Sequence, residues 1–262
     1  MDPVGYIMDL AYSSAGIALG DGKRSLVEAR LGKRLRTLGC DLAGYVERLE
    51  RDPGERVQML DLLTTNHTAW LREPAHFTDF EQRVLPLAIK RAGAGTPRVR
   101  VWCAAAATGE EPWTIAMCLN RTVPGADAQL LATDLSTRAL AKARAGRYDE
   151  DRVAALSVDE KRAALEVVEQ GPPKLYAVSA RLRALVQFAR LNLMEEWPMR
   201  GPFDAIFCRN VMIYFDAQTQ ERLVNRLAAL LLPGGTLYVG HSESLSAIKH
   251  PLRTHKVATY VR

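Results

Sequence analysis

One stretch, residues 99–119, constrains the fold of this chain more than any other. It reads VRVWCAAAATGEEPWTIAMCL: an apolar run, small residues from Ala104 to Gly109, two carboxylates and an amphipathic segment. A short β-rich run, closed by small residues and followed by helical periodicity, is typical of a βαβ unit whose helix N-terminus faces a ligand. The stretch therefore predicts an α/β fold with a nucleotide-cofactor site at this turn.

The turn also indicates the kind of cofactor. The dinucleotide fingerprint needs three glycines, and within this turn alanines replace all but Gly109. Carboxylates Glu110 and Glu111 at the helix start would repel a phosphate while suiting a cation. S-adenosylmethionine, which carries an ammonium and a sulfonium charge, fits this pattern. The alternative is an ordinary strand-turn-helix unit whose glutamates only complement the helix dipole.

Length, charge and cysteine usage argue against a membrane-inserted, secreted or metal-binding protein. At 262 residues the chain is long enough for one large domain or two modest ones, and its formal net charge of +5 is mild. It shows neither a signal peptide nor an apolar segment of membrane length, so we expect a cytoplasmic protein with reduced thiols and no membrane insertion. The histidines and cysteines lack metal-ligand spacing, so no metal is expected. The cysteines are Cys40, Cys103, Cys118 and Cys208.

The first part of the chain reads as helical. Apolar residues recur at helical spacing from Val27 to Leu38, and Gly39 follows as a C-cap candidate. Other helices are expected at residues 1–20, 41–51, 55–63 and about 76–92. Residues 93–97, rich in Gly and Pro, read as a linker. The predicted domains are a helical N-terminal domain over 1–92 and a cofactor-binding domain over 98–262.

One of these helices carries a basic stripe. Lys23, Arg30 and Arg34 fall within about 40° of one another at 100° per residue, and Lys33 lies next to them. The stripe is either a solvated face or a docking surface for an acidic partner. A grip on nucleic-acid phosphates is a further alternative.

After the linker, strands and helices alternate. Strands are expected at 129–133, 186–189, 203–208, 236–240 and about 256–262, and a helix at about 217–232. Asp134 follows the second strand, where an acid accepts hydrogen bonds from ribose hydroxyls or caps a helix starting near Ser136. Arg209 and Asn210 end another strand, at the edge where open α/β sheets bind ligands. Residues 148–185 read as an insertion, with a helix at 159–169 and a strand at 175–178.

Four separated runs carry a family resemblance: TTNHTAWLRE from Thr64, AAATGEEPW from Ala105, FDAIFCRNVMIYF from Phe203 and GHSES from Gly240. Over nearly its whole length the chain resembles the CheR family of chemotaxis receptor methyltransferases, which esterify receptor glutamates with S-adenosylmethionine. The resemblance implies a helical N-terminal domain and a doubly wound, Rossmann-like methyltransferase domain with a small β-insertion. It also implies docking of an acidic receptor helical bundle on Lys23, Arg30, Lys33 and Arg34.

The resemblance further implies roles for single residues. Asn66, Thr68 and Arg72 would reach the cofactor from the N-terminal side. Glu111 would meet the methionine end, Asp134 the ribose, Asn192 and Leu193 the adenine region, and Arg209 with Asn210 the far wall.

A receptor glutamate is ionised at neutral pH, so it attacks the methyl group directly and needs no general base. Catalysis then depends on alignment and on the exclusion of water. We assign Arg72 to hold the incoming carboxylate and Tyr214 to line the methyl pocket. Alternatively, Arg72 serves the cofactor and Tyr214 belongs to the core.

Competing functions fit the residues less well. Residues 240–244 begin like a hydrolase nucleophile elbow but end in Ser, too late in the chain for an acid and a His to follow. Base-amine methyltransferases show an Asn-Pro-Pro-aromatic run where this chain has Arg209-Asn210-Val211-Met212, so no nucleic acid is expected. A module that binds S-adenosylmethionine without catalysis remains as an alternative function.

The β-insertion departs from one family pattern. Family members that tether to a receptor tail peptide carry a glycine-rich loop in this insertion. Here the region has only Gly171-Pro172-Pro173, so tethering is doubtful.

Overall fold

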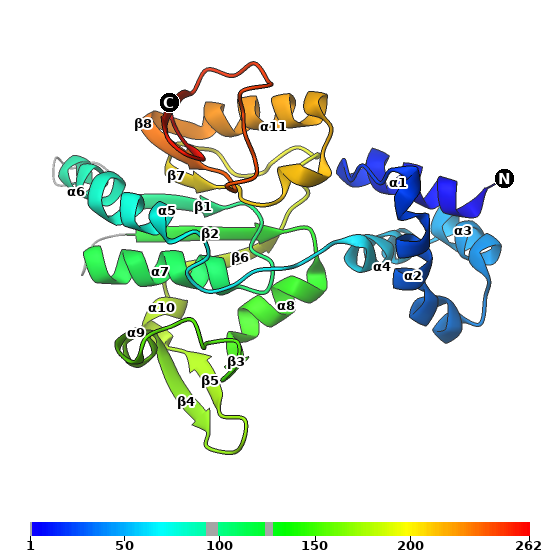
Figure 1. Ribbon diagram of the computed structural model, residues 1–262, viewed down its shortest axis with the longest axis horizontal. Coiled ribbons are helices and arrows are strands. Elements are labelled where there is room, and N and C mark those ends of the chain that lie inside the picture. Colours follow the sequence, from blue (N-terminus) through cyan, green and yellow to red (C-terminus); the bar gives the residue numbers. More distant parts are fainter. Residues whose placement is uncertain (1, 93–98, 124–127) are drawn as a thin grey trace.

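The computed structural model describes residues 2–92, 99–123 and 128–262, so the expected linker at 93–97 lies outside the described residues. Figure 1 shows a cluster of N-terminal helices beside a larger part built on a β-sheet. A small second sheet extends from that larger part. Within the described residues, no helix is both long and apolar enough to cross a membrane.

Four helices form the N-terminal cluster: α1 (Pro3–Ala15), α2 (Arg24–Leu38), α3 (Leu42–Arg51) and α4 (Pro53–Leu63), with a 3-10 turn η1 (Asp21–Lys23) before α2. The side chains of Asp41 and Asp52 accept backbone N–H groups at the starts of α3 and α4. Helix α2 ends at Gly39, whose φ of 65° is left-handed, as the sequence predicts.

The buried residues divide the chain into separate cores. Leu31 and Met59 lie in a core made only by α1–α4 and their loops. The next helical stretch consists of α5 (Pro74–Asp79), a π-helical turn η2 (Phe80–Val84) and α6 (Leu85–Ala92). Its Phe80 and Leu85 belong to the core of the larger part instead. The sequence predicts a single regular helix here within the N-terminal domain; the packing joins it to the sheet, and the domain limits stay a prediction.

The main sheet has the order β6-β2-β1-β7-β8-β10-β9. Its strands are β1 (Val99–Cys103), β2 (Ala128–Asp134), β6 (Val186–Arg190), β7 (Phe203–Phe207), β8 (Leu231–Tyr238), β9 (Arg253–Lys256) and β10 (Thr259–Val261). The first five in this order are parallel, and β10 and β9 are antiparallel to their neighbours. The expected last strand at 256–262 is therefore a hairpin, because Ala258 takes a left-handed φ of 53° and turns the chain.

Helices cover both faces of the sheet. The stretch α5–α6 packs on one face with α7 (Glu110–Thr122) and α8 (Thr137–Ala145), and α11 (Ala217–Leu230) packs on the other. Alternate side chains of β1 enter the two cores: Val101 meets the α7 side and Trp102 the α11 side. This is a doubly wound α/β sheet, as predicted. Polar residues are therefore concentrated at the carboxyl ends of the parallel strands.

The insertion folds as an antiparallel sheet of order β3-β5-β4. It comprises β3 (Arg147–Asp149), α9 (Val158–Ala164), β4 (Leu165–Glu169), β5 (Leu175–Val178) and α10 (Ala180–Arg183). The helix expected at 159–169 stops at Ala164. Residues from Leu165 on pair with β5 because the β-branched Val167 and Val168 favour an extended chain. The strand at 175–178 is where the sequence predicts it.

Candidate functional site

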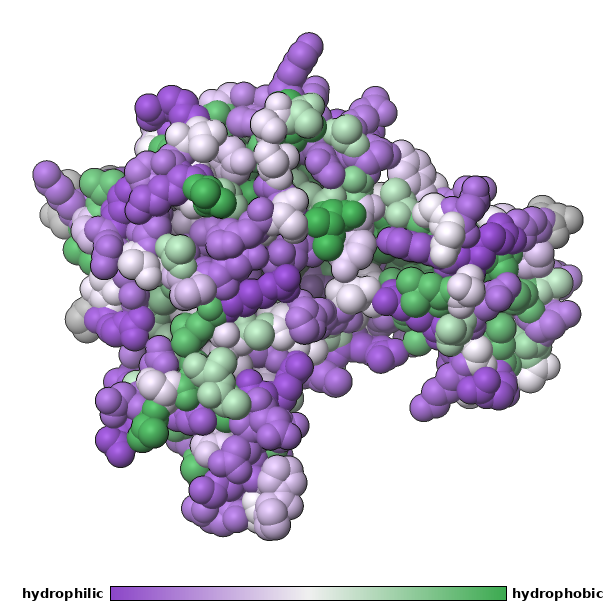
Figure 2. Space-filling view, viewed as in Figure 1, coloured by the Kyte–Doolittle hydropathy of each residue, from purple (hydrophilic) through white to green (hydrophobic). Residues whose placement is uncertain are grey.

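A cavity lies between the two parts, at the carboxyl ends of β1, β2, β6 and β7. Figure 2 shows the surface hollowed where the helical cluster meets the larger part. Parallel sheets bind ligands at this edge. The residues that directly follow these strands and line the cavity are Ala104, Leu135, Leu191, Asn192, Arg209 and Asn210.

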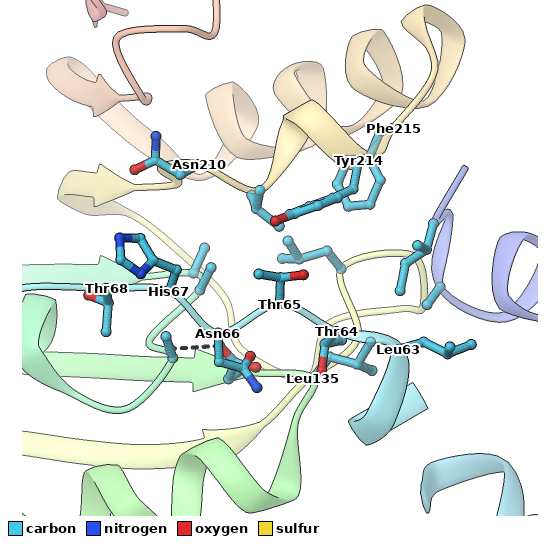
Figure 3. Close-up of a pocket in the computed structure, with 18 of the residues that line it drawn as sticks. Leu63, Thr64, Thr65, Asn66, His67, Thr68, Leu135, Asn210, Tyr214 and Phe215 are labelled. Carbon is cyan, nitrogen blue, oxygen red and sulfur yellow. Dashed lines mark hydrogen bonds between the residues drawn. The ribbon is translucent and has the colours of Figure 1, made fainter. Parts of the chain in front are cut away.

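The helical part supplies the opposite wall. Figure 3 shows residues 63–68 running along the cavity, across from Tyr214 and Phe215. Ala15, Ile17 and Leu19, at the end of α1 and in the loop after it, also line it. The backbone N–H of Ala18 donates to the carbonyl of Tyr214 at 2.8 Å and holds this loop in place. This contribution could not be predicted from the sequence, because apolar loop residues form no recognisable motif.

All of the predicted site residues line this one cavity, although they come from distant segments. They are Asn66, Thr68, Arg72, Glu111, Asp134, Asn192, Leu193, Arg209, Asn210 and Tyr214. Their individual contacts with a cofactor stay a prediction.

Asp134 ties together the loops after β1 and β2. Its carboxylate accepts the backbone N–H of Ala107 at 2.7 Å and that of Ser136 at 2.8 Å. Burial raises the pKa of Asp134, against these two hydrogen bonds. The N-cap of α8 is Ser136 and not Asp134, since the Ser136 hydroxyl accepts from Ala139. One carboxylate oxygen accepts from each loop, and each keeps further acceptor capacity at the cavity that Asp134 lines.

A buried guanidinium lies between two carboxylates at the end of β7. Arg209 donates to Glu111 Oε2 at 2.6 Å, to Glu73 Oε2 at 2.9 Å and to the carbonyl of Arg72 at 2.5 Å. Burial opposes its charge, but Glu111 and Glu73 outweigh burial, so the pKa of Arg209 lies above its ordinary value. Two carboxylates, Glu111 and Glu73, therefore surround this guanidinium, while burial raises the pKa of Glu111 and the Arg72 charge lies nearby. A carboxylate at this position suits a cationic ligand.

The neighbouring Glu110 does not face the cavity. Its carboxylate pairs with Arg152 at 2.5 Å and accepts the hydroxyl of Thr108 at 2.7 Å. Of the two glutamates at the start of α7, only Glu111 therefore remains a candidate for the ligand. Gly109 before them has a φ of 104°, and a Cβ there would lie 2.9 Å from the Ala143 backbone. This glycine thus serves helix packing and is not needed for the approach of a ligand.

The side chain of Asn192 is largely committed within the protein. Its Nδ2 donates to the Ser14 carbonyl at 2.6 Å and to Glu195 at 3.0 Å, and its Oδ1 accepts the Met194 N–H. This network fastens α1 to the loop after β6. A side-chain donor for adenine is therefore not available from Asn192, and buried Leu193 beside it offers apolar contact.

The two candidate catalytic side chains, Arg72 and Tyr214, both line the cavity. Arg72 Nη1 donates to the His67 carbonyl at 3.2 Å, the one hydrogen bond of this guanidinium within the described residues. Tyr214 ends η3 (Met212–Tyr214) and its ring is half-buried at the cavity. An arginine with donors to spare beside an aromatic wall can hold a carboxylate.

Glu243 organises the loop that carries Asn210 and Tyr214, and sequence reasoning missed it. Its buried carboxylate accepts four backbone N–H groups, from Asn210, Met212, Ile213 and Gly240, at 2.6–3.3 Å. A Cβ at Gly240 would collide with Asn210 and Glu243. The GHSES run in the sequence was the available signal, but nothing local shows which backbone its glutamate caps.

Two of the four predicted docking residues make contacts inside the protein. Arg34 forms two hydrogen bonds with buried Glu55, at 2.9 and 2.6 Å. Arg30 donates to the Leu63 carbonyl and to Thr65 Oγ1 and lines the cavity. These two side chains therefore also serve contacts within the protein, and the docking role of all four residues stays a prediction. Lys33 is exposed, and exposed Lys23 also lines the cavity.

The sheet is doubly wound and ends in an antiparallel hairpin. The cavity has alanines and carboxylates where a dinucleotide site has a phosphate-binding glycine loop. Together these features define an S-adenosylmethionine-dependent methyltransferase. The cavity wall carries small side chains at Ala104, Ala105 and Ala107. They leave room for a ligand, but they do not let it come as close to the backbone as a pyrophosphate must. The chain belongs to the CheR methyltransferase family. Residues 5–64 match the family's all-alpha domain and residues 66–261 its SAM binding domain.

Relatives match over nearly the whole chain. It is 42% identical over 260 residues to the probable chemotaxis protein methyltransferase of Rhizobium etli, covering 96% of each chain. It is 43% identical to the chemotaxis protein methyltransferase of Klebsiella aerogenes, covering 92% of this chain and 83% of that one. The Escherichia coli chemotaxis protein methyltransferase is 42% identical, with 93% and 84% covered.

Proposed function

We propose that this protein transfers the methyl group of S-adenosylmethionine to glutamate side chains of a chemoreceptor cytoplasmic domain, forming methyl esters in chemosensory adaptation. The observation that carries the proposal is the match of both family domains, one to the helical part and one to the sheet part. The names of the relatives support chemotaxis as the context. A substrate of this kind would place the protein in the cytoplasm.

Bound S-adenosylmethionine supplies an electrophilic methyl group on a sulfonium. In this proposal Glu111 faces its methionine end, Asp134 holds the ribose, and Asn66, Thr68 and Leu193 contact the rest of the nucleoside. Arg209 keeps Glu111 in place and, with Asn210, forms the far wall. S-adenosylhomocysteine is the product.

The chain's own residues would align the substrate. An ionised glutamate needs no base, so the protein has to hold one carboxylate oxygen in line with the methyl group. Arg72 pairs with that carboxylate, and the Tyr214 ring closes the site against water. The support is that both side chains line the same cavity.

We propose that the acidic methylation region of the receptor bundle docks along α2, with exposed Lys33 and Lys23 as the main electrostatic contacts. Arg30 and Arg34 add charge to this face while serving internal contacts. Tethering to a receptor tail peptide forms no part of the proposal, because the loop between β4 and β5 lacks a glycine-rich run.

The test is methyl transfer from labelled S-adenosylmethionine to a purified receptor cytoplasmic fragment. We expect label in the fragment that mild base releases as methanol, since glutamyl esters hydrolyse and N-methyl groups do not. A fragment with its methylated glutamates changed to alanine is the control. Base-stable label in DNA or RNA would support the nucleic-acid alternative, and cofactor binding with no transfer would support a sensor.

A further inference from the structure

A second cluster of ligating side chains lies beside the cofactor cavity. Glu73, His76 and His241 bring one carboxylate oxygen and two imidazole nitrogens within 4.8 Å of one another. Glu73 and His76 lie one turn apart at the start of α5, and His241 follows β8. These three residues are not among those that line the cavity. The expectation of no metal relied on spacing along the chain, and the fold brings together ligands that spacing does not reveal.

His76 is an unexplained buried polar group. It is 1% exposed, and neither of its ring nitrogens has a hydrogen-bond partner among the described residues. Buried polar groups in proteins are nearly always paired, so an unpaired one points to a missing partner. Burial and the nearby Arg209 charge lower the pKa of His76 to about 4. Imidazole nitrogens of histidine are the commonest metal ligands in proteins.

The distances are close to those of a metal site. His76 Nδ1 lies 3.5 Å and His241 Nε2 4.0 Å from the same oxygen, Glu73 Oε2. Tetrahedral zinc with bonds of about 2.0–2.1 Å holds its ligand atoms roughly 3.3 Å apart. The His241 side chain is 47% exposed, so its ring has room to turn toward the other two ligands. The same exposure gives an ion a path from solvent and leaves a fourth position for water.

We propose that Glu73, His76 and His241 form a binding site for a zinc-class transition-metal dication, and that occupation of this site inhibits methyl transfer. The inhibitory part rests on the proposed function, whereas the binding part does not.

The link to activity is a shared oxygen atom. Glu73 Oε2 also accepts Arg209 Nη2 at 2.9 Å. A dication on that oxygen competes with the guanidinium, because two cations cannot share it without strong repulsion. Arg209 also holds Glu111 and the backbone of Arg72. An ion at the site therefore loosens the wall of the cofactor cavity.

The binding test titrates the purified, apo full-length protein with Co²⁺ and follows visible absorption, then displaces Co²⁺ with Zn²⁺. We expect the intense bands of tetrahedral Co²⁺ with the wild type. His241→Ala should weaken Zn²⁺ binding by at least tenfold, since even the loss of an outer-shell partner costs about 10–100-fold. The matched control is His250→Ala, because His250 stacks on Tyr260 outside the cluster.

The activity test adds Zn²⁺ to the methylation assay. We expect inhibition that a chelator reverses in the wild type and in His250→Ala, and resistance in His241→Ala with its basal rate retained. Absence of tetrahedral Co²⁺ bands, equal metal affinity of His241→Ala, or equal inhibition of His241→Ala would each overturn the proposal. If Co²⁺ binds as expected but no receptor fragment is methylated, the proposed function fails and the site stands.

Discussion

At the scale of single residues, Arg72 has the most direct part in the proposed chemistry. It is held by one hydrogen bond to His67, while its own carbonyl accepts from Arg209. The backbone is therefore held in place, and the guanidinium of a residue that lines the cavity keeps donors for a ligand.

We expect Arg72→Ala to cut the single-turnover rate at saturating cofactor by about a hundredfold, the scale of a lost positioning contact. Arg72→Lys should rescue only partly, because a point charge lacks the planar fork that fixes both carboxylate oxygens. The measurement is rapid-quench methylation of a receptor fragment. A wild-type rate in the alanine variant, with only the cofactor Kd raised, would assign Arg72 to the cofactor instead.

Asp134 carries a separate prediction. Asp134→Ala should weaken S-adenosylhomocysteine binding by more than tenfold, because hydrogen bonds to a charged group contribute about 1.5–3 kcal/mol. It also frees the N–H groups of Ala107 and Ser136, so the melting temperature should fall. Calorimetric titration measures the affinity, and exposed Asp151→Ala is the control. Unchanged affinity would remove Asp134 from the binding site.

At the scale of elements, one carboxylate shapes the loop after β7. We expect Glu243→Gln to lower both the melting temperature and the methylation rate. Each carboxylate oxygen accepts two backbone N–H groups, so an amide NH₂ in place of either oxygen leaves two of them without an acceptor. Loss of two such bonds costs about 2–6 kcal/mol. Thermal unfolding and the rate at saturating substrates measure the effects. Exposed Ser242→Ala is the control, and a wild-type rate in Glu243→Gln would show that the loop needs no cap.

Helices α2 and α4 are joined by the Arg34–Glu55 pair. Glu55 also accepts from the Tyr45 hydroxyl at 2.9 Å and lies 3.5 Å from Arg48. Losing one partner of a buried pair costs about 3–5 kcal/mol, so we expect Arg34→Ala to cost roughly 2 kcal/mol, with Arg48 compensating in part. Exposed Arg36→Ala on the same helix should cost little.

The stabilisation that the Arg34–Glu55 pair provides should depend on pH in a definite direction. The hydrogen bonds from Arg34 lower the pKa of Glu55 in the folded protein. The stabilisation is therefore present near neutral pH and is lost as the pH falls through that lowered pKa. The stability difference between wild type and Arg34→Ala, from urea unfolding at several pH values, should shrink in acid. A difference that grows in acid would contradict the assignment.

The sequence predicted those strands that an apolar run between turn residues defines, and it missed those that depend on pairing with distant segments. Strand β1 and strand β5 begin and end where the sequence places them, because apolar runs between turn residues define both. The terminal hairpin and β4 were missed, since strand pairing depends on partners elsewhere in the chain. The motif residues of the site were found through the resemblance. The contributions of Ile17 and Glu243 were not, because they come from packing and backbone capping.

At the scale of the whole molecule, few polar contacts hold the helical part to the sheet. Asp61 accepts the backbone N–H of Thr137 at 2.8 Å and also its hydroxyl. The Tyr12 hydroxyl donates to Asp216 at 2.5 Å. These four residues do not line the cofactor cavity, but Thr137 and Asp216 follow closely after Leu135 and Phe215, which do.

Receptor docking is expected to depend on long-range charge. We expect Lys33→Glu to raise the KM for receptor several-fold and to leave the cofactor Kd unchanged, because Lys33 is exposed and does not line the cavity. Added salt should raise the wild-type KM and narrow the difference. Lys90→Glu on α6, equally exposed, is the control. Equal effects of both reversals would indicate a nonspecific charge effect, and no effect would mean that α2 is only solvated.

The wall that α2 gives to the cofactor cavity has an evolutionary consequence. Leu26 and Arg30 face the ligand from the same helix whose Lys33 faces solvent. A lineage that exchanged residues 1–64 for those of a relative would acquire new receptor recognition. The same exchange would replace the residues that this part contributes to the wall of the cofactor cavity. The helical part is thus no interchangeable adaptor, and a change in receptor choice that preserves the cofactor cavity has to proceed by substitutions at exposed residues of α2 that do not line it, such as Lys33.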